Sequence, residues 1–195
     1  MPERIRAVSK KEFTQAVPIL ADLLAQAMAQ TPPWKGVIID REATAKRFIN
    51  DSQTGTETLV AQIGGEIVGA TMYCPMSLQT IKTSEDLAEP EVIASYLEKI
   101  HQKTGIGAFV YIDKTFVSPS YQNQGIASRM RVQLLEKVAQ ENPDGVIVFT
   151  AHASNNPAII KSSQRLGFLQ TGIKMVSEAD ENLFNQYWVK IISPE

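Results

Sequence analysis

The stretch that decides the fold is TFVSPSYQNQGIASRM, residues 115–130. Its first residues favour a strand, Pro119 ends that strand, and a helix is expected to begin close to Gly125. The first N–H groups of a helix have no acceptor within the helix, and the helix dipole places a partial positive charge there. Gly125 and Ala127 are small enough to let an anion approach the backbone. The stretch therefore predicts a strand, a phosphate-binding turn and a helix.

Apolar spacing and turn residues predict the elements on both sides of this turn. The predicted helix is amphipathic, with an i, i+4 series formed by Ile126, Met130, Leu134 and Val138. Ser9 and Glu12 have the spacing of a capping box at the start of another helix, which Pro18 is expected to kink or to divide in two. Two β-prone runs flank Gly64-Gly65 and predict a hairpin. We expect strands over 5–8, 58–63, 66–73, 108–117, 146–151, 168–171 and 187–192, and helices from Ser9 to 30 and over 41–49, 91–103, 125–140 and 156–166.

Composition excludes several classes of protein. The chain has 195 residues, 44% of them hydrophobic, and a net charge of -2, so neither nucleic acid nor an anionic membrane surface is an expected partner. One cysteine, Cys74, excludes an intramolecular disulfide, and with only two histidines a metal site is not expected. Neither a signal peptide nor a membrane-spanning run is present, which favours a cytoplasmic protein. No linker or repeat interrupts the chain, so we expect a single domain over residues 1–195.

Two motifs together resemble a known family. The pattern Val117-x-Pro119-x-x-Gln122-x-x-Gly125-Ile126-Ala127 is similar to the acetyl-CoA signature of the GNAT superfamily of N-acetyltransferases. The later segment NPAIIKSSQRLGF, residues 156–168, resembles a second GNAT motif that begins at an asparagine and ends in Leu-Gly-Phe. The resemblance covers about residues 56–171, with a helical insertion over about 75–106 as an addition.

The resemblance implies a fold and a co-substrate. The expected fold is α/β (α+β): a mixed, mostly antiparallel sheet of about six to seven strands flanked by helices, with a V-shaped splay between the fourth and fifth strands. Acetyl-CoA is the expected co-substrate, with no metal. The backbone of Phe116 and Val117 would bind the pantetheine arm, and Asn156 would face the pantetheine or the thioester. The residues expected to hold the pyrophosphate are Gln122, Asn123, Gln124, Gly125, Ile126, Ala127 and Ser128.

The implied reaction is acetyl transfer to a primary amine by direct attack in a ternary complex. Asp113 is the candidate general base, since an aliphatic amine is protonated at neutral pH; alternatively it pairs with a surface lysine. Ser163 occupies the position where many family members carry a tyrosine that protonates the leaving thiolate, so Ser163 is the candidate general acid. The alternatives are that Ser163 relays the proton through water, that another tyrosine such as Tyr111 or Tyr121 is the acid, or that the thiolate leaves unaided. His152 is expected to transfer a proton, contact substrate or be a hydrogen-bonded structural residue, and Trp34 to contact substrate or cap the core.

The acceptor is not specified by the sequence. A small-molecule amine and a protein amine are both compatible with the resemblance, and a homodimer is one option for the oligomeric state. Because Ser163 replaces the usual tyrosine, a non-catalytic acyl-CoA-binding sensor on the same fold is an alternative function. A different α/β protein, whose turn holds a phosphorylated metabolite, is a further alternative.

Overall fold

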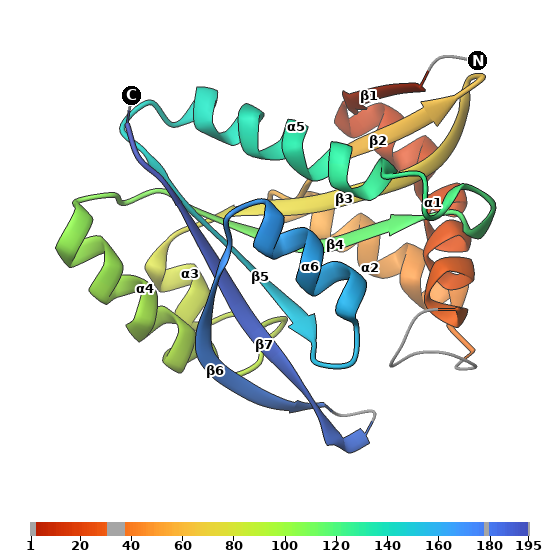
Figure 1. The fold of residues 1–195 in the computed structure, drawn as a ribbon. Helices are drawn as coiled ribbons and strands as arrows, with labels where there is room; N and C mark the ends of the chain where they lie inside the picture. Colours follow the sequence, from red (N-terminus) through yellow and green to blue (C-terminus); the bar gives the residue numbers. More distant parts are fainter. Residues whose placement is uncertain (1–2, 31–37, 178–179, 195) are drawn as a thin grey trace. The chain divides into compact units, whose positions relative to one another are not determined.

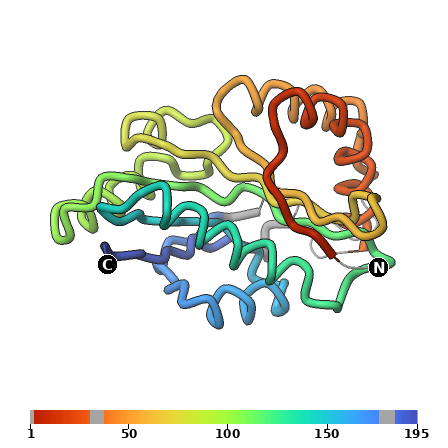
Figure 2. Tube along the Cα trace, turned by 90° about the horizontal axis from the view of Figure 1, so that it is seen from above, coloured from red at the N-terminus to blue at the C-terminus, as the bar shows by residue number. Residues whose placement is uncertain are grey.

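The computed structural model describes residues 3–30, 38–177 and 180–194 (Figure 1). The candidate substrate contact Trp34 lies outside the described residues. Along the chain the elements are β1 (Glu3–Ala7), α1 (Lys10–Ala29), α2 (Arg41–Gln53), β2 (Glu57–Ile63), β3 (Glu66–Met76), α3 (Leu78–Lys82), α4 (Pro90–Thr104), β4 (Phe109–Val117), the 3-10 helix η1 (Pro119–Tyr121), α5 (Ile126–Glu141), β5 (Val146–Ala153), α6 (Pro157–Arg165), β6 (Leu169–Ser177) and β7 (Asp180–Ile192). Figure 2 follows this path as a tube.

The strands form a seven-stranded sheet in the order β1-β2-β3-β4-β5-β7-β6. The pairs β1–β2, β2–β3, β5–β7 and β6–β7 are antiparallel, and β4 pairs with β5 in parallel. The predicted fold class, a mixed and mostly antiparallel sheet of six to seven strands flanked by helices, is therefore confirmed. The chain divides into two compact units, each described by itself: Met1–Cys74 with Asp113–Leu135 (the first unit), and Pro75–Ile112 with Glu136–Glu195 (the second unit).

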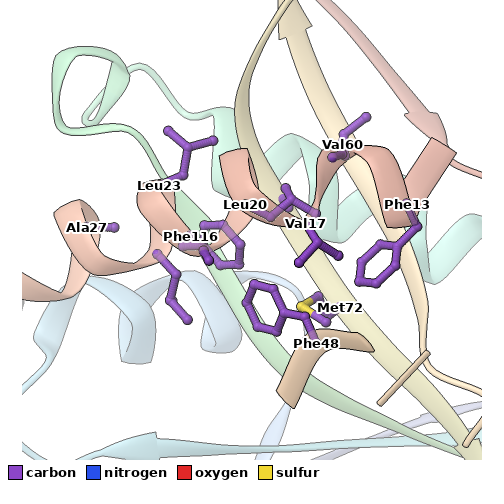
Figure 3. Packing of buried hydrophobic residues seen from close by; sticks show 13 residues of the cluster. Phe13, Val17, Leu20, Leu23, Ala27, Phe48, Val60, Met72 and Phe116 are labelled. Atoms are coloured by element: carbon purple, nitrogen blue, oxygen red, sulfur yellow. The ribbon is translucent and has the colours of Figure 1, made fainter. Parts of the chain in front are cut away.

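Helix α1 supplies much of the core of the first unit. Its predicted capping box is confirmed, because the Ser9 hydroxyl accepts from the Glu12 N–H and the Glu12 carboxylate accepts from the Ser9 N–H. Pro18 does not divide the helix, since it lies on the exposed side, where water can bind the carbonyl group that lost its partner. The buried face packs against Phe48, Met72 and Phe116, as Figure 3 shows.

The predicted hairpin β2–β3 leads into a close approach of β3 and β4. Gly64 and Gly65 have φ values of 63° and 87°, as a primed turn requires. Further along β3, a Cβ on Gly69 would lie 2.9 Å from the Phe116 carbonyl oxygen. The Ser118 N–H also donates to the carbonyl of Val68 at 2.8 Å. A glycine at position 69 therefore lets β3 lie against the end of β4 that precedes the predicted phosphate turn.

The second unit contains the insertion and the long C-terminal hairpin. Helix α4 begins at Pro90 as predicted, and the short α3 before it was not predicted. The Tyr187 hydroxyl donates to the Ala88 carbonyl at 2.8 Å, which attaches the segment in front of α4 to β7. Strands β6 and β7 extend well beyond the predicted ranges, and Figure 1 shows them side by side. Their added length comes from backbone pairing with each other, which requires no apolar alternation.

The parallel pair β4–β5 is short. Its register joins Phe109–Ile112 to Ile147–Thr150, and the Thr150 hydroxyl donates to the Ile112 carbonyl at 3.0 Å. Beyond these residues β4 continues to Val117 and β5 to Ala153. Pairing that ends before both strands end is the pattern expected where two strands splay. The carboxyl ends of parallel strands are also where open α/β sheets commonly bind ligands.

Candidate active site

The turn before α5 joins a strand to a helix that starts next to Gly125, as the sequence predicted. After η1 the chain passes through Asn123 with φ 62° and Gly125 with φ 76°. Asparagine and glycine are the residues that adopt this left-handed region most readily. Asn123, Gln124, Gly125 and Ser128 are exposed, whereas Ile126 is buried. The turn therefore presents its backbone to solvent while the first apolar residue of α5 fixes it to the core.

Gln122 holds the turn to the end of β4. Its side-chain Nε2 donates to the Val117 carbonyl at 3.0 Å, and its own N–H donates to the Pro119 carbonyl at 3.3 Å. Both of these groups are thus engaged within the turn. These two hydrogen bonds of Gln122 help to shape the turn.

An ion pair stands at the first turn of α5. The Arg129 guanidinium bonds both carboxylate oxygens of Glu3 on β1, and its Nη1 donates to the Gln124 carbonyl at 2.9 Å. The hydrogen bond from Arg129 holds the pKa of the Glu3 carboxyl below its ordinary value, and the same bond raises the pKa of Arg129. This arginine ties β1 to the turn through side chains 126 positions apart in the chain.

Apolar packing sets the start of α5 against the sheet. The predicted series is confirmed, since Ile126, Met130, Leu134 and Val138 are all at most 2% exposed. Ile126 and Met130 share a cluster with Val117 on β4. Burying each such side chain contributes about 1.5–3 kcal/mol, so the helix start is held firmly at the end of the strand. On the same helix Arg131 is 1% exposed, and burial lowers its pKa to about 10.

Asp113, the candidate base, lies on β4 in the first unit and forms an ion pair with Lys114. The sequence left this pairing open as the alternative to a catalytic role, and the structure shows that Asp113 has a lysine partner. Two positions further on, the Thr115 hydroxyl is 2.8 Å from that of Thr71. Cys74 is half-buried, and burial raises the pKa of its thiol, which disfavours it as a nucleophile.

The second motif forms the ends of α6 in the second unit. Asn156 is the N-cap, and its side-chain oxygen accepts from the Ile159 N–H at 3.3 Å. At the other end the Gly167 N–H donates to the Gln164 carbonyl and the Phe168 N–H to the Ser163 carbonyl. These two bonds and the φ of 78° at Gly167 make a Schellman motif, which explains the Leu-Gly-Phe ending.

Ser163 lies on the buried side of α6. It is fully buried, and its Oγ is 2.6 Å from Nε2 of His152 at the end of β5. The sequence marked these two residues separately, as a candidate acid and as a candidate proton carrier, and the structure joins them. The apolar spacing of Ile159 and Ile160 on α6 indicates that Ser163 faces the sheet. No local signal identifies His152 as its partner.

The structure places the candidate residues in two groups. Within the first unit, Asp113, Phe116 and Val117 on β4 precede the turn residues 122–128. Within the second unit, Asn156 and Ser163 lie at the start and on the buried side of α6. Among the residues that the structure describes, no group of three or more histidine, cysteine, aspartate or glutamate side chains is arranged to hold a metal ion. Nor does any described helix combine the length and apolar character needed to cross a bilayer.

Comparison with known proteins gives the family. A search of curated proteins returned no match. Among solved structures, the chain resembles a ribosomal-protein-alanine N-acetyltransferase from Brucella melitensis, with 19% identity, a TM-score of 0.64, and 97% of this chain and 99% of that chain covered. It also resembles yncA from Salmonella typhimurium, determined with its cofactor acetyl-CoA, with 16% identity, a TM-score of 0.65, and coverage of 100% and 96%.

A third similar structure is that of NAA60 from Arabidopsis thaliana in complex with acetyl-CoA, with 16% identity, a TM-score of 0.63, and coverage of 98% and 99%. At these identities the three structures establish the fold alone. The family model for the acetyltransferase (GNAT) family matches residues 23–168, which is most of the chain and includes both motifs. The chain therefore belongs to the GNAT acetyltransferase family.

Proposed function

We propose that this chain is an acetyl-CoA-dependent N-acetyltransferase that moves an acetyl group to a primary amine by direct attack in a ternary complex. The observation that carries the proposal is the turn from Asn123 to Ser128 at the start of α5, in which Asn123, Gln124, Gly125 and Ser128 are exposed. Backbone N–H groups at a helix start and the helix dipole favour a pyrophosphate. Family membership supports acetyl-CoA as the co-substrate, as do the similar structures determined with it.

The end of β4 supports a role for Val117 in binding the thioester. The N–H and C=O groups of successive strand residues point to opposite edges of the strand. The Phe116 carbonyl lies against Gly69 on β3, so the backbone groups of Val117 point to the other edge, where its carbonyl accepts from Gln122. We assign the Val117 N–H to the thioester oxygen, on which negative charge develops during attack. The Phe116 backbone is then better suited to holding β3 than to holding the pantetheine.

Proton removal from the amine is assigned to Asp113. A primary amine has a pKa of about 10, so it must lose a proton before it attacks. The Asp113 carboxylate accepts a hydrogen bond from Lys114 and has lone pairs that can also accept a proton, directly or through water. We assign Asn156 to the pantetheine arm through its side-chain N–H groups, because its oxygen already caps α6. The acceptor is a small-molecule amine or a protein amine.

Two measurements test this function. Calorimetric titration with CoA should show binding, and thiol release from acetyl-CoA should rise with at least one member of a panel of polyamines, amino acids, aminoglycosides and peptides. The peptides are used with and without a free N-terminal amine. Thiol release with the free-amine peptides would indicate a protein acceptor, and thiol release with the small amines alone would indicate a small-molecule acceptor. Absence of CoA binding would refute the proposal.

A second candidate function is an acyl-CoA-binding sensor without catalysis. It is favoured by the engagement of both candidate catalytic side chains, Asp113 with Lys114 and Ser163 with His152. It predicts CoA binding without thiol release for any amine. Turnover of one amine at a rate above that of the Asp113→Asn variant would exclude it.

A further inference from the structure

An ion pair between β1 and α5 holds the backbone of the turn before α5. Nε and Nη2 of Arg129 each donate to one oxygen of the Glu3 carboxylate, and Nη1 donates to the Gln124 carbonyl at 2.9 Å. All three guanidinium nitrogens therefore have an acceptor within the first unit. Glu3 precedes residues 23–168, which the family model matches, so this contact comes from a part of the chain outside that match.

The bond to Gln124 also determines the orientation of the Gly125 N–H group. The Gln124 C=O and the Gly125 N–H belong to one peptide unit, which is planar, so a hydrogen bond that fixes the carbonyl fixes the N–H as well. A Cβ on Gly125 would lie 3.0 Å from Nη1 of Arg129, which places the guanidinium against this same peptide unit. Among the described residues, no group accepts a hydrogen bond from the Gly125 N–H, so it stays available to a ligand.

The turn is held at both of its ends. At the first end, Gln122 Nε2 donates to the Val117 carbonyl at 3.0 Å, and at the other end Arg129 holds the Gln124 carbonyl. Asn123, between these two bonds, is exposed and has a φ of 62°. A turn that already has its binding conformation loses less conformational entropy when a ligand binds, so it binds more tightly. Both bonds therefore prepare the turn for a ligand.

We propose that Arg129, anchored by Glu3, positions the peptide unit between Gln124 and Gly125 for the pyrophosphate of coenzyme A. This inference rests on the proposed function. Glu3 has two effects in it: its negative charge balances that of the guanidinium, and its two oxygens fix the plane of the guanidinium. The pair acts on the ligand through the backbone of the turn, so Arg129 is a positioning residue and does not itself contact the phosphate groups.

A direct role for Arg129 predicts the opposite response to a change at position 3. If the guanidinium itself bound the phosphate groups, Glu3 would compete with CoA for it, and removal of the carboxylate would strengthen binding. If Arg129 positions the turn, loss of the carboxylate releases the long side chain from its fixed rotamer, and binding weakens. The sign of the change in Kd therefore distinguishes the two roles.

The test measures the Kd of CoA by isothermal titration in the wild type, Glu3→Gln, Arg129→Met and Arg129→Lys. Glutamine keeps the size of glutamate without its charge, and methionine keeps a long apolar chain without donors. Lysine keeps the positive charge but lacks the planar arrangement of N–H groups that contacts Glu3 and Gln124 together. Melting temperatures of the same samples show whether each variant is folded.

Two variants in the same unit are matched controls. Glu42→Gln makes the same change of charge as Glu3→Gln, at the exposed ion pair with Lys46 on α2. Arg6→Met removes the arginine from another ion pair of β1, the pair with Glu12 in the first turn of α1. Because both pairs join elements other than α5, both controls should bind CoA as the wild type does.

We expect Arg129→Met to raise the Kd of CoA about twofold to tenfold, which corresponds to the loss of one hydrogen bond. Glu3→Gln should change the Kd in the same direction, by about twofold or more. Arg129→Lys should not restore the wild-type affinity, although it keeps the charge. Without CoA, the ¹⁵N resonance of Gly125 should move in Glu3→Gln and Arg129→Met and stay in place in both controls, because this nitrogen responds to hydrogen bonding at the carbonyl of its own peptide unit.

The outcomes separate this inference from the proposed function. If the wild type binds CoA and Glu3→Gln binds it more tightly, or if Arg129→Lys binds it like the wild type, the positioning role is overturned and the proposed function stands. Variants that melt at a lower temperature with an unchanged Kd would assign the pair to stability alone and also overturn the inference. If the wild type does not bind CoA, the proposed function itself is refuted. Should Arg129→Met not fold, Glu3→Gln and Arg129→Lys decide by the same comparison.

Discussion

Replacement of Gly125 by alanine tests the central feature of the turn. Gly125 has φ 76°, and a Cβ there would lie 3.0 Å from Nη1 of Arg129. The left-handed conformation costs alanine roughly 1–2 kcal/mol. The displaced guanidinium would also lose its bond to the Gln124 carbonyl, which contributes about 0.5–1.5 kcal/mol. We therefore expect the free energy of unfolding of Gly125→Ala to fall by about 1.5–3.5 kcal/mol in urea titrations.

Gly125→Ala should also weaken CoA binding. The added methyl group stands on the face of the turn where the pyrophosphate would approach the backbone N–H groups. Losing one charge-assisted hydrogen bond costs about 1.5–3 kcal/mol, or roughly a tenfold to hundredfold weaker Kd. Isothermal titration with CoA measures this change directly on the folded variant.

Gly105→Ala is the matched control. Gly105 ends α4 with φ 75°, nearly the same conformation, and among the described atoms none lies within 4 Å of where its Cβ would be, apart from its neighbours in the chain. It should lose a similar strain energy of roughly 1–2 kcal/mol and keep its affinity for CoA. If Gly125→Ala binds CoA as tightly as Gly105→Ala does, the turn is not the pyrophosphate site.

Three further substitutions test the scaffold. Glu3→Gln removes the partner of Arg129 and should lower the free energy of unfolding by less than about 1 kcal/mol at pH 7, because the pair is partly exposed. Pairing lowers the pKa of Glu3, so its contribution to stability is lost as the carboxylate takes up a proton. Urea titrations should therefore show the difference in stability between wild type and variant vanishing as the pH falls below about 4.3. Gly69→Ala brings a Cβ within 2.9 Å of the Phe116 carbonyl oxygen and should cost about 1–3 kcal/mol; an unchanged melting temperature would contradict the close approach. Tyr187→Phe removes a buried hydrogen bond, at a cost of about 1 kcal/mol. Because burial raises the pKa of Tyr187, the unfolded wild type loses this proton first as the pH rises past about 10; wild-type stability should therefore fall more steeply there than that of Tyr187→Phe.

The sequence predicted those elements whose causes are local. The capping box of Ser9 and Glu12, the Gly64-Gly65 turn and the apolar series from Ile126 to Val138 each depend on residues a few positions apart. For these elements the nearby side chains determine both the conformation and the buried face. The turn between β4 and α5 belongs to the same class, because its shape follows from the residues within it.

Elements that depend on distant partners were missed or shortened. Strands β6 and β7 pair through backbone groups, so their full length is not visible in the apolar pattern. The alternative that Pro18 divides α1 in two is wrong, because the helix continues through it and burial of the surrounding face holds it together. Tertiary packing outweighed a local penalty in this case.

The same distinction between local and distant causes applies to the candidate site. The end of β4 and the start of α5 on either side of the turn were predicted, whereas the partners of the side chains in the turn were not. The bond from Gln122 to Val117, the ion pair of Arg129 with Glu3 and the contact of Ser163 with His152 were absent from the predictions. Two of these pairs join residues from different elements, and side-chain directions across elements are set only when the chain has packed.

The contact between His152 and Ser163 also constrains how this sequence can change over time. A ring on β5 and a ring on α6 do not fit together at a separation of 2.6 Å between the present side-chain atoms. A lineage can therefore acquire a tyrosine at position 163 only together with a small residue at position 152. Among related sequences we expect these two positions to covary, with a ring at one and a small residue at the other, and intermediates that carry two rings to be rare.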